Sequence, residues 1–468
     1  MKKTNIIIAL VAVVALSGCS SYRNLKNSLY APYERPEIRT DSVYRDTGSA
    51  DGVNVEYVDT LSFGNLPWRE VFTDPLLQQH IQKALDNNVN MLNAALNIKM
   101  AEEQLKVARL AFLPQFTFNP QGGISKLGNA DATKYYTLPV VASWNVNLFG
   151  GLTSQKRAAQ VQLLAARDYQ LAVQTSLVSN VANMYYTLLM LDKQLQIVND
   201  MTVLTKETWD MMKLQMEFGR ARSTSVQSAE ANYYSVQTQA VDIQRQIRET
   251  ENALSLVMGE PAHGIARGTL ENQSLPAKFA TGIGIQLLNN RPDVHAYEMQ
   301  LAQCFYNIET ARSRFYPSIT ISPSGAFTNN NGMINPGKIL LSAVASLTQP
   351  IFMNGQLTAG LRVAEAQYQQ ALNDWQNSVL QAGSEVSNAL VLYNSSAEKS
   401  ALEAQQIATL EKNVEHTQLL FRQSSSTYLE VITAQQNLLN ARISKVSDDF
   451  YKMQAVVNLY YALGGGTQ

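Results

Sequence analysis

The chain has 468 residues, a length that usually holds two or three domains. Its 37 Lys and Arg residues nearly balance 38 Asp and Glu residues, so no global field attracts nucleic acid or anionic lipid. Only 16% of the residues are charged, which suits a wet but weakly charged surface. The four His residues lie in no metal-ligand spacing, and no nucleotide loop or nucleophile elbow occurs. The sequence therefore gives no sign of catalysis, of a metal or of a cofactor.

The N-terminus is predicted to be an export signal that ends at a lipidation site. Lys2 and Lys3 form a positive start, and residues 6–16 form an apolar core of signal length. Leu16-Ser17-Gly18-Cys19 resembles the lipobox of bacterial lipoproteins, which implies cleavage before Cys19 and acylation of that residue. The alternative is an ordinary secretory signal with a chance cysteine. Several acyl chains on Cys19 would form a firm membrane anchor.

The other cysteine is Cys304, so acylation of Cys19 leaves no pair for an intramolecular disulfide. We expect Cys304 to be a small buried side chain. After the signal, no run approaches the roughly 18 apolar residues of a membrane-spanning helix. If the chain crosses a membrane, it must do so with β-strands.

An internal repeat with an offset near 204 residues organises the rest of the chain. Residues 108–118 match residues 311–321, so Pro114 aligns with Pro317. Phe149 aligns in the same way with Phe352. The unit is far longer than that of a solenoid, and the chain is therefore a duplicated half.

Each half is predicted to contain a helix, two strands, a long helix, a turn and a second helix. In the first half, Asp74 and Pro75 supply an N-cap and a first-turn proline for a helix that runs to about Phe112, before Pro114. In the second half, Pro292 begins a shorter helix, which Pro317 ends.

The strand candidates lie at about 114–149 and 317–352. Residues 137–149 and 339–352 alternate between apolar and small or polar side chains, which is typical of half-buried strands. Each is long enough to cross a bilayer as a tilted strand, for which about 9 to 11 residues suffice.

Long helices are predicted at 154–217 and 358–421, and each would span about 95 Å at 1.5 Å per residue. Apolar residues recur there and in the last helix at spacings of four and three, a repeat that indicates coiled-coil packing. The seam of the last helix contains one polar residue, Gln436. The seam residues are Leu164, Leu171, Val178, Ala182, Tyr185 and Leu189, then Tyr368, Leu372, Trp375, Val379, Ala382, Val386, Ala389 and Tyr393, then Ile432, Leu439, Ile443, Val446, Phe450, Met453, Val457 and Tyr460.

Four strands per chain cannot close a barrel, and open strand edges are not tolerated in lipid. The smallest membrane barrels have about eight strands, so the chain must share a barrel with copies of itself. Three copies would supply twelve strands around a lumen too wide for side chains to fill. The geometry predicts a hollow channel shared by several copies of the chain.

Three motifs carry a resemblance to a known family. Residues 66–76 are like W-x-x-x-F-x-D-P-x-L, residues 287–294 are like L-L-x-x-R-P-D-[VI], and residues 428–435 are like Y-L-[DE]-V-L-x-A-Q. The chain resembles a TolC-like outer-membrane factor, of the OprM-type lipoprotein subgroup of RND tripartite efflux systems, along nearly all of its length.

This resemblance implies a mainly α fold with a membrane β-barrel, made of duplicated α-β-β-α-α halves. A homotrimer would form a 12-stranded β-barrel in the outer membrane and a long α-helical coiled-coil barrel in the periplasm. A periplasmic adaptor would link this passive duct to an inner-membrane RND transporter. The implied segments are a signal peptide at 1–18, an N-terminal extended or equatorial segment at 19–73, the first repeat at 74–258, an equatorial linker at 259–290 and the second repeat at 291–468.

The family also implies a gate at the two helical turns, residues 218–225 and 421–430. Glu430 occupies the acidic position of the second turn and Ser225 that of the first, so we expect three copies of Glu430 to contribute to the gate. The alternative is that Glu430 only stabilises a helix N-terminus. Ser424 replaces the family's glycine in the second turn, whereas Gly219 keeps it in the first.

Two other functions stay open. The duct could serve a type I secretion or metal-efflux system. A lipid-anchored coiled-coil scaffold without a pore would explain the heptads and Cys19, but not the alternating strands in both halves. The sequence does not indicate the cargo.

Overall fold

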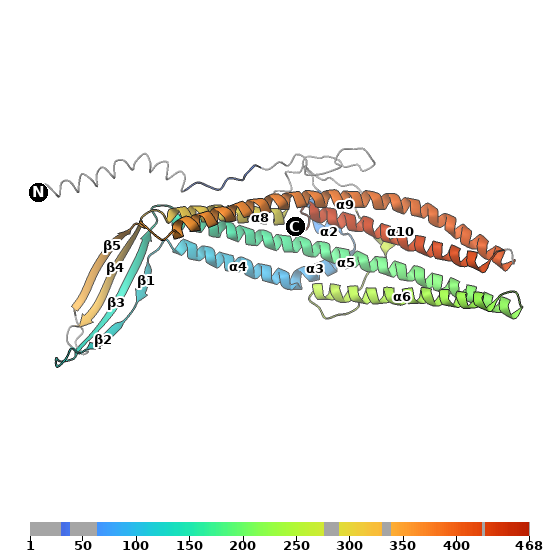
Figure 1. The fold of residues 1–468 in the computed structure, drawn as a ribbon, viewed down its shortest axis with the longest axis horizontal. Helices are drawn as coiled ribbons and strands as arrows, with labels where there is room; N and C mark the ends of the chain where they lie inside the picture. Colours follow the sequence, from blue (N-terminus) through green and yellow to red (C-terminus); the bar gives the residue numbers. More distant parts are fainter. Residues whose placement is uncertain (1–29, 38–62, 276–289, 330–337, 424–425, 468) are drawn as a thin grey trace. The chain divides into compact units, whose positions relative to one another are not determined.

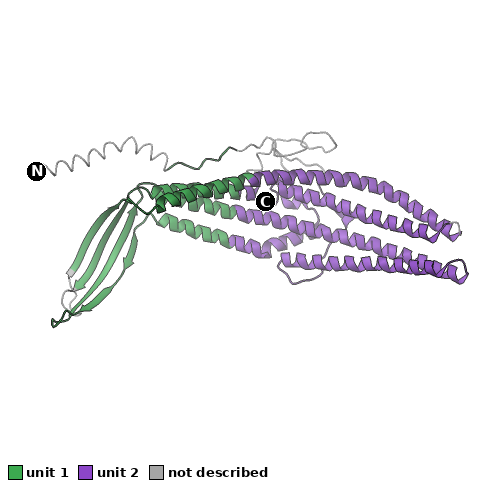
Figure 2. Ribbon diagram, in the orientation of Figure 1, with its two compact units in different colours: residues 1–37, 96–167, 296–376 green, residues 38–95, 168–295, 377–468 purple. Residues whose placement is uncertain are grey.

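A computed structural model describes residues 30–37, 63–275, 290–329, 338–423 and 426–467 (Figure 1). The chain divides into two compact units (Figure 2). Unit 1 comprises residues 1–37, 96–167 and 296–376, and unit 2 comprises residues 38–95, 168–295 and 377–468. Within the described residues, no helix combines the length and the apolar character needed to cross a membrane.

Three helices of the first half have counterparts of equal length in the second half. The helices of the first pair have 22 residues each, those of the second pair have 67 and those of the third pair have 35. This agreement confirms the duplicated, mainly α fold. The pairs are α4 (Val89–Leu110) and α8 (Pro292–Ser313), α5 (Gly151–Glu217) and α9 (Gln356–Arg422), and α6 (Ser223–Val257) and α10 (Tyr428–Ala462). Short elements are η1 (Phe63–Asn65), α2 (Trp68–Val71) and η2 (Leu270–Asn272).

The first helix of the first half differs from its prediction, because it is two helices. Asp74 accepts a hydrogen bond from the Leu76 backbone at 2.9 Å, which confirms the N-cap of α3 (Pro75–Asn87). Asn88 then has an extended backbone, and its side chain accepts a hydrogen bond from the Asn90 backbone at 2.9 Å. Such a side chain competes with the helical hydrogen bonds and starts a new helix, α4.

Unit 1 contains an antiparallel sheet in the order β1-β3-β4-β5, in which β2 also pairs with β3. The first predicted strand is two pieces, since Pro120 has no N–H to donate between them. The alternating strands were predicted slightly too far along the chain, because the turns into α5 and α9 begin earlier. The strands are β1 (Gln115–Phe118), β2 (Gln121–Ser125), β3 (Thr133–Val146), β4 (Ser318–Asn329) and β5 (Lys338–Thr348).

The sheet has one apolar face and one more polar face, as the alternation predicted. Val140, Gly325 and Leu341 pair across three strands, so they share one face. In the next row, Ser324 and Ser342 are hydrogen-bonded through their hydroxyls at 2.7 Å on the opposite face.

Unit 2 contains most of the predicted coiled-coil packing. The seams of α5 and α10 are largely buried there, for example Tyr185 and Val457, which are fully buried. At the polar seam position, Gln436 is exposed and donates to Asn232 on α6 at 3.0 Å. Its neighbour Gln435 is buried instead and donates to the Thr208 hydroxyl at 2.9 Å. In unit 1, Leu164 is 44% exposed, although it was placed on the α5 seam.

Candidate functional site: the helical turns of unit 2 and their anchors

The turn between α5 and α6 depends on Gly219. This residue has φ +71, a left-handed conformation that glycine adopts without strain. Its N–H donates to Met216 O at 2.9 Å, and the next N–H, of Arg220, donates to Gln215 O at 2.8 Å, which closes the end of α5. Ser225, at the acidic position of this turn, lies half-buried in the first turn of α6.

The turn between α9 and α10 places Glu430 in a capping box. The Thr427 hydroxyl accepts from the Glu430 N–H at 3.4 Å, and the Glu430 carboxylate accepts from the Thr427 N–H at 2.9 Å. Ser426 donates to the same carboxylate, and these hydrogen bonds lower the pKa of Glu430, with that of Ser426 having the largest effect. Glu430 therefore caps the N-terminus of α10. Its role in the gate stays a prediction. Ser424 lies outside the described residues.

One apolar cluster joins the helices next to the two turns, which lie side by side (Figure 1). Trp209 is its largest member; its ring stacks on Tyr233 at a centroid distance of 5.5 Å. Lys213 Nζ lies 3.3 Å from the Trp209 ring centroid, a cation–π contact. Sequence reasoning missed this contact, although Lys213 follows Trp209 by four residues. The cluster comprises Trp209, Met212, Val226, Ala229, Phe421 and Val431.

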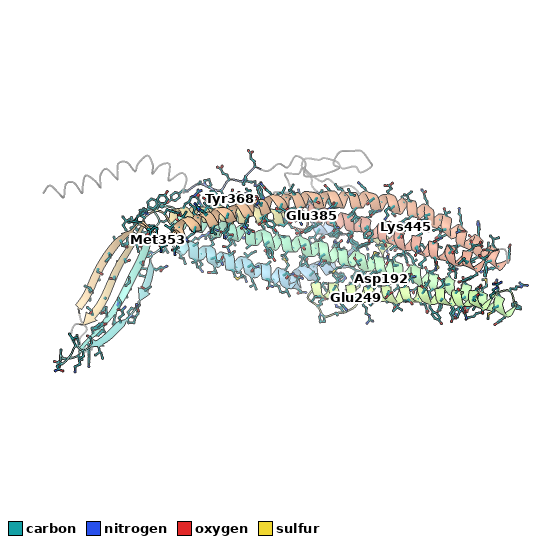
Figure 3. All side chains as sticks on the ribbon, viewed as in Figure 1. Asp192, Glu249, Met353, Tyr368, Glu385 and Lys445 are labelled. Carbon is teal, nitrogen blue, oxygen red and sulfur yellow. The ribbon has the colours of Figure 1, made fainter. Side chains whose placement is uncertain are left out.

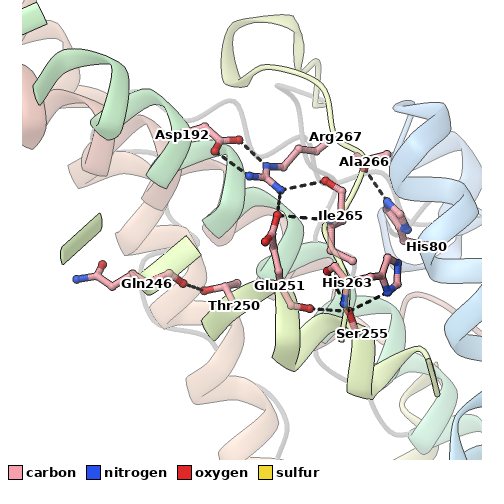
Figure 4. A network of polar contacts seen from close by, with 10 residues as sticks. All are labelled: His80, Asp192, Gln246, Thr250, Glu251, Ser255, His263, Ile265, Ala266 and Arg267. Carbon is pink, nitrogen blue, oxygen red and sulfur yellow. Dashed lines mark hydrogen bonds and ion pairs between the residues drawn. The ribbon is translucent and has the colours of Figure 1, made fainter. Parts of the chain in front are cut away.

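A second set of contacts anchors the segment after α6 to α5 and α6 (Figure 4). Arg267 donates to both carboxylate oxygens of Asp192 on α5, at 2.5 and 2.9 Å, and to Glu251 on α6 at 2.6 Å. These hydrogen bonds, above all those to Asp192, raise the pKa of Arg267. His80 on α3 approaches the Ala266 carbonyl at 2.8 Å. Composition had marked this segment only as a linker, so sequence reasoning missed Arg267.

A third set of contacts, made by Arg291, anchors the start of α8. Arg291 is 3% exposed. Its guanidinium donates to both oxygens of Asp293 at 3.0 and 2.6 Å, to Glu385 on α9 at 2.5 Å (Figure 3), and to the Ala462 carbonyl of α10 at 3.3 Å. Burial alone would lower the pKa of Arg291, but the two carboxylates outweigh it and raise that pKa. The predicted helix start at Pro292 is confirmed, and Arg291 also joins α8 to α9 and α10.

The predicted lipidation site, Cys19, lies outside the described residues. Cys304 is half-buried on α8, and burial raises the pKa of its thiol. Among the residues that the structure describes, no group of three or more His, Cys, Asp or Glu side chains could hold a metal ion.

Two long helical hairpins, each preceded by strands, define a duplicated α-helical fold with a sheet. The chain belongs to the outer membrane efflux protein family, whose sequence profile matches residues 80–260 and 285–465. It is accordingly an efflux channel of the outer membrane.

Known proteins are similar to this chain over nearly its whole length. The cation efflux system protein CusC of Escherichia coli K12 is 27% identical, with 97% of each chain covered. The toluene efflux pump outer membrane protein TtgF of Pseudomonas putida is also 27% identical, over 98% of this chain and 96% of TtgF.

Solved structures of two channels have the same fold. The crystal structure of CusC has a TM-score of 0.80 at 25% identity, over 92% of this chain and 98% of that one. The open-state MtrE channel of Neisseria gonorrhoeae has a TM-score of 0.81 at 24% identity, over 93% and 98%.

Proposed function

We propose that three copies of this chain form the exit duct of a tripartite efflux pump. The duct passively conducts small molecules from an inner-membrane RND transporter and a periplasmic adaptor to the exterior. The pump supplies the energy, and acyl chains on Cys19 anchor each copy.

The open sheet is the observation that carries this proposal. Within the described residues, β5 pairs only with β4, and β1 and β2 pair only with β3, so both outer edges of the sheet lack a strand partner. Leu341 and Leu347 on β5 are 78% and 68% exposed. An apolar sheet with two open edges is stable in lipid only if another chain pairs with those edges. With β1 and β2 counted as one interrupted strand, three copies supply twelve strands.

An apolar stripe on α4 supports the same assembly. Leu96, Met100, Val107 and Leu110 are 53%, 57%, 67% and 53% exposed, and their spacings of four, seven and three residues place them on one helix face. A helix of a neighbouring copy would cover this stripe. The helical turns of unit 2 are the ends that would meet the adaptor.

The assembly can be tested by measuring the mass of the protein in mild detergent by light scattering. We expect a trimer for the wild type and its loss in Met100→Glu, which puts a charge on the stripe. Arg109→Glu, at an exposed position of α4 about 100° or more around the helix from the stripe, should stay trimeric. A stable wild-type monomer would contradict the proposal.

The transport role is tested by deleting the gene and measuring sensitivity to antibiotics, bile salts, solvents and toxic metal ions. We expect sensitivity to at least one class, restored by the wild type and not by Met100→Glu. Normal resistance to every class would contradict efflux, and the class that becomes toxic would identify the cargo.

A further inference from the structure

The two hairpins can be compared position by position, because their helices have equal lengths. An offset of 205 residues relates α5 to α9 and α6 to α10, since 356 − 151 and 428 − 223 both equal 205. In the first hairpin, Val198 on α5 and Ile243 on α6 are buried, 0% and 8% exposed. The same positions in the second hairpin are Glu403 and Asp448. Two carboxyl groups therefore stand where the first hairpin has two aliphatic side chains.

These carboxyl groups are poorly compensated. Asp448 is 3% exposed and accepts a hydrogen bond from Lys399 Nζ at 2.8 Å. Glu403 Oε2 is buried and makes no hydrogen bond to any described residue. The other nearby ammonium, of Lys445, is already bound to Asp449 at 2.6 Å. Among the described residues, the two lysines near the pair are therefore each hydrogen-bonded to an aspartate, and neither is hydrogen-bonded to Glu403.

Other charged groups surround the pair at a greater distance. Asp449 also accepts from the Ser400 hydroxyl at 2.6 Å, and Tyr451 interacts with Lys399. A groove of about 490 Å³ beside the network is lined by Lys445 and Asp449, together with Lys193 and Asp200 on α5. Lys193 is paired with Glu271 at 2.5 Å, so it does not neutralise the pair.

Electrostatics then favours the protonated form of Glu403. Burial, followed by the negative charge of Asp448, raises the pKa of Glu403, because both penalise a second carboxylate at this place.

We propose that Glu403 keeps its proton beside the Asp448 carboxylate and makes the α9/α10 hairpin a pH-sensitive element, tightly packed in acid and looser as the pH rises. Protonated Glu403 stabilises the hairpin fully below the ordinary pKa of a carboxyl group. This stabilisation is lost as the pH rises through the raised pKa of the folded state. The α5/α6 hairpin, with Val198 and Ile243 at the same positions, lacks this response.

Hydrogen exchange of backbone amides, corrected for the intrinsic rate at each pH, tests the inference on the full protein. We expect residues 399–403 and 445–449 to lose protection from mildly acidic to neutral pH, because Glu403 then gives up its proton. Residues 194–198 and 240–244 serve as the internal control and should not change. Unchanged protection of the α9/α10 segments would overturn the proposal.

Variants separate the pair from other titrating groups. Glu403→Val with Asp448→Ile restores the residues of the first hairpin and should remove the pH response. Glu403→Gln, which mimics the protonated acid, provides the same test if the double variant does not fold. Glu411→Gln removes an exposed partner of Arg442 on the same hairpin and should keep the response. A pH response that persists in Glu403→Gln would refute the role of Glu403, and the readout does not depend on trimer conductance.

Discussion

Asn88 and Arg291 make the same contact at equivalent positions of the two halves. Asn88 Nδ2 donates to Val257 O at the end of α6 at 2.8 Å, and Arg291 Nη1 donates to Ala462 O at the end of α10 at 3.3 Å. Each residue directly precedes a 22-residue helix. The duplicated scaffold has kept the contact, while an amide makes it in one half and a buried cation in the other.

Arg291→Ala should destabilise the protein by about 3 kcal/mol, because it leaves the carboxylates of Asp293 and Glu385 without their buried partner. Thermal unfolding followed by circular dichroism measures the effect. Arg245→Ala removes an exposed pair with Glu249 and should change the stability little, because solvent screens such a pair. Equal losses in the two variants would show that Arg291 is not an anchor.

Gly219→Ala and Gly464→Ala should differ, although both glycines have positive φ, +71 and +84. At Gly219 nothing lies within 4 Å of an added Cβ, so only the left-handed backbone costs energy, about 1 kcal/mol. At Gly464 the Cβ would lie 2.3 Å from the Asn290 carbonyl oxygen, so the backbone must also shift. We expect a clearly larger loss of unfolding free energy for Gly464→Ala, and the reverse order would contradict this account.

Glu430→Gln tests the predicted gate. If the carboxylate acts in the gate, single-channel conductance or cation selectivity changes in Glu430→Gln but not in Thr427→Ala, which disrupts the same capping box and keeps the charge. If Glu430 only caps α10, neither variant changes conductance, and both weaken the amide protection of the first turn of α10.

The capping role of Glu430 also has a pH signature. Because its pKa is lowered from the ordinary 4.5, its stabilisation of α10 is present above that value and is lost as the pH falls through the folded-state pKa. Acid should therefore reduce protection at the start of α10, and Glu430→Gln should remove this dependence.

Cys19→Ser should abolish labelling of the protein by radioactive palmitate, since the predicted lipidated thiol is absent. Cys304→Ser should leave labelling intact, because Cys304 is half-buried on α8. Label that persists in Cys19→Ser would contradict the lipobox interpretation.

The long helices and the two faces of the sheet could be predicted from the sequence, because heptad spacing and alternation are local signals of burial. Pro75 and Pro292 also marked helix starts correctly. Asn88 was missed, because its side chain interrupts the helix through contacts that no periodicity reports. Arg267 was missed as well, since its carboxylate partners, Asp192 and Glu251, are 75 and 16 residues away in the chain. Long-range polar contacts of this kind require the fold.

The matched lengths of α6 and α10, 35 residues each, constrain how this protein can evolve. One residue inserted into α10 would turn every later side chain by about 100° around the helix axis. Arg442 and Asp448 would then leave their partners on α9, and Ala462 would leave Arg291. Natural variants should therefore gain or lose whole seven-residue blocks in these helices, and they should do so together in both arms of a hairpin.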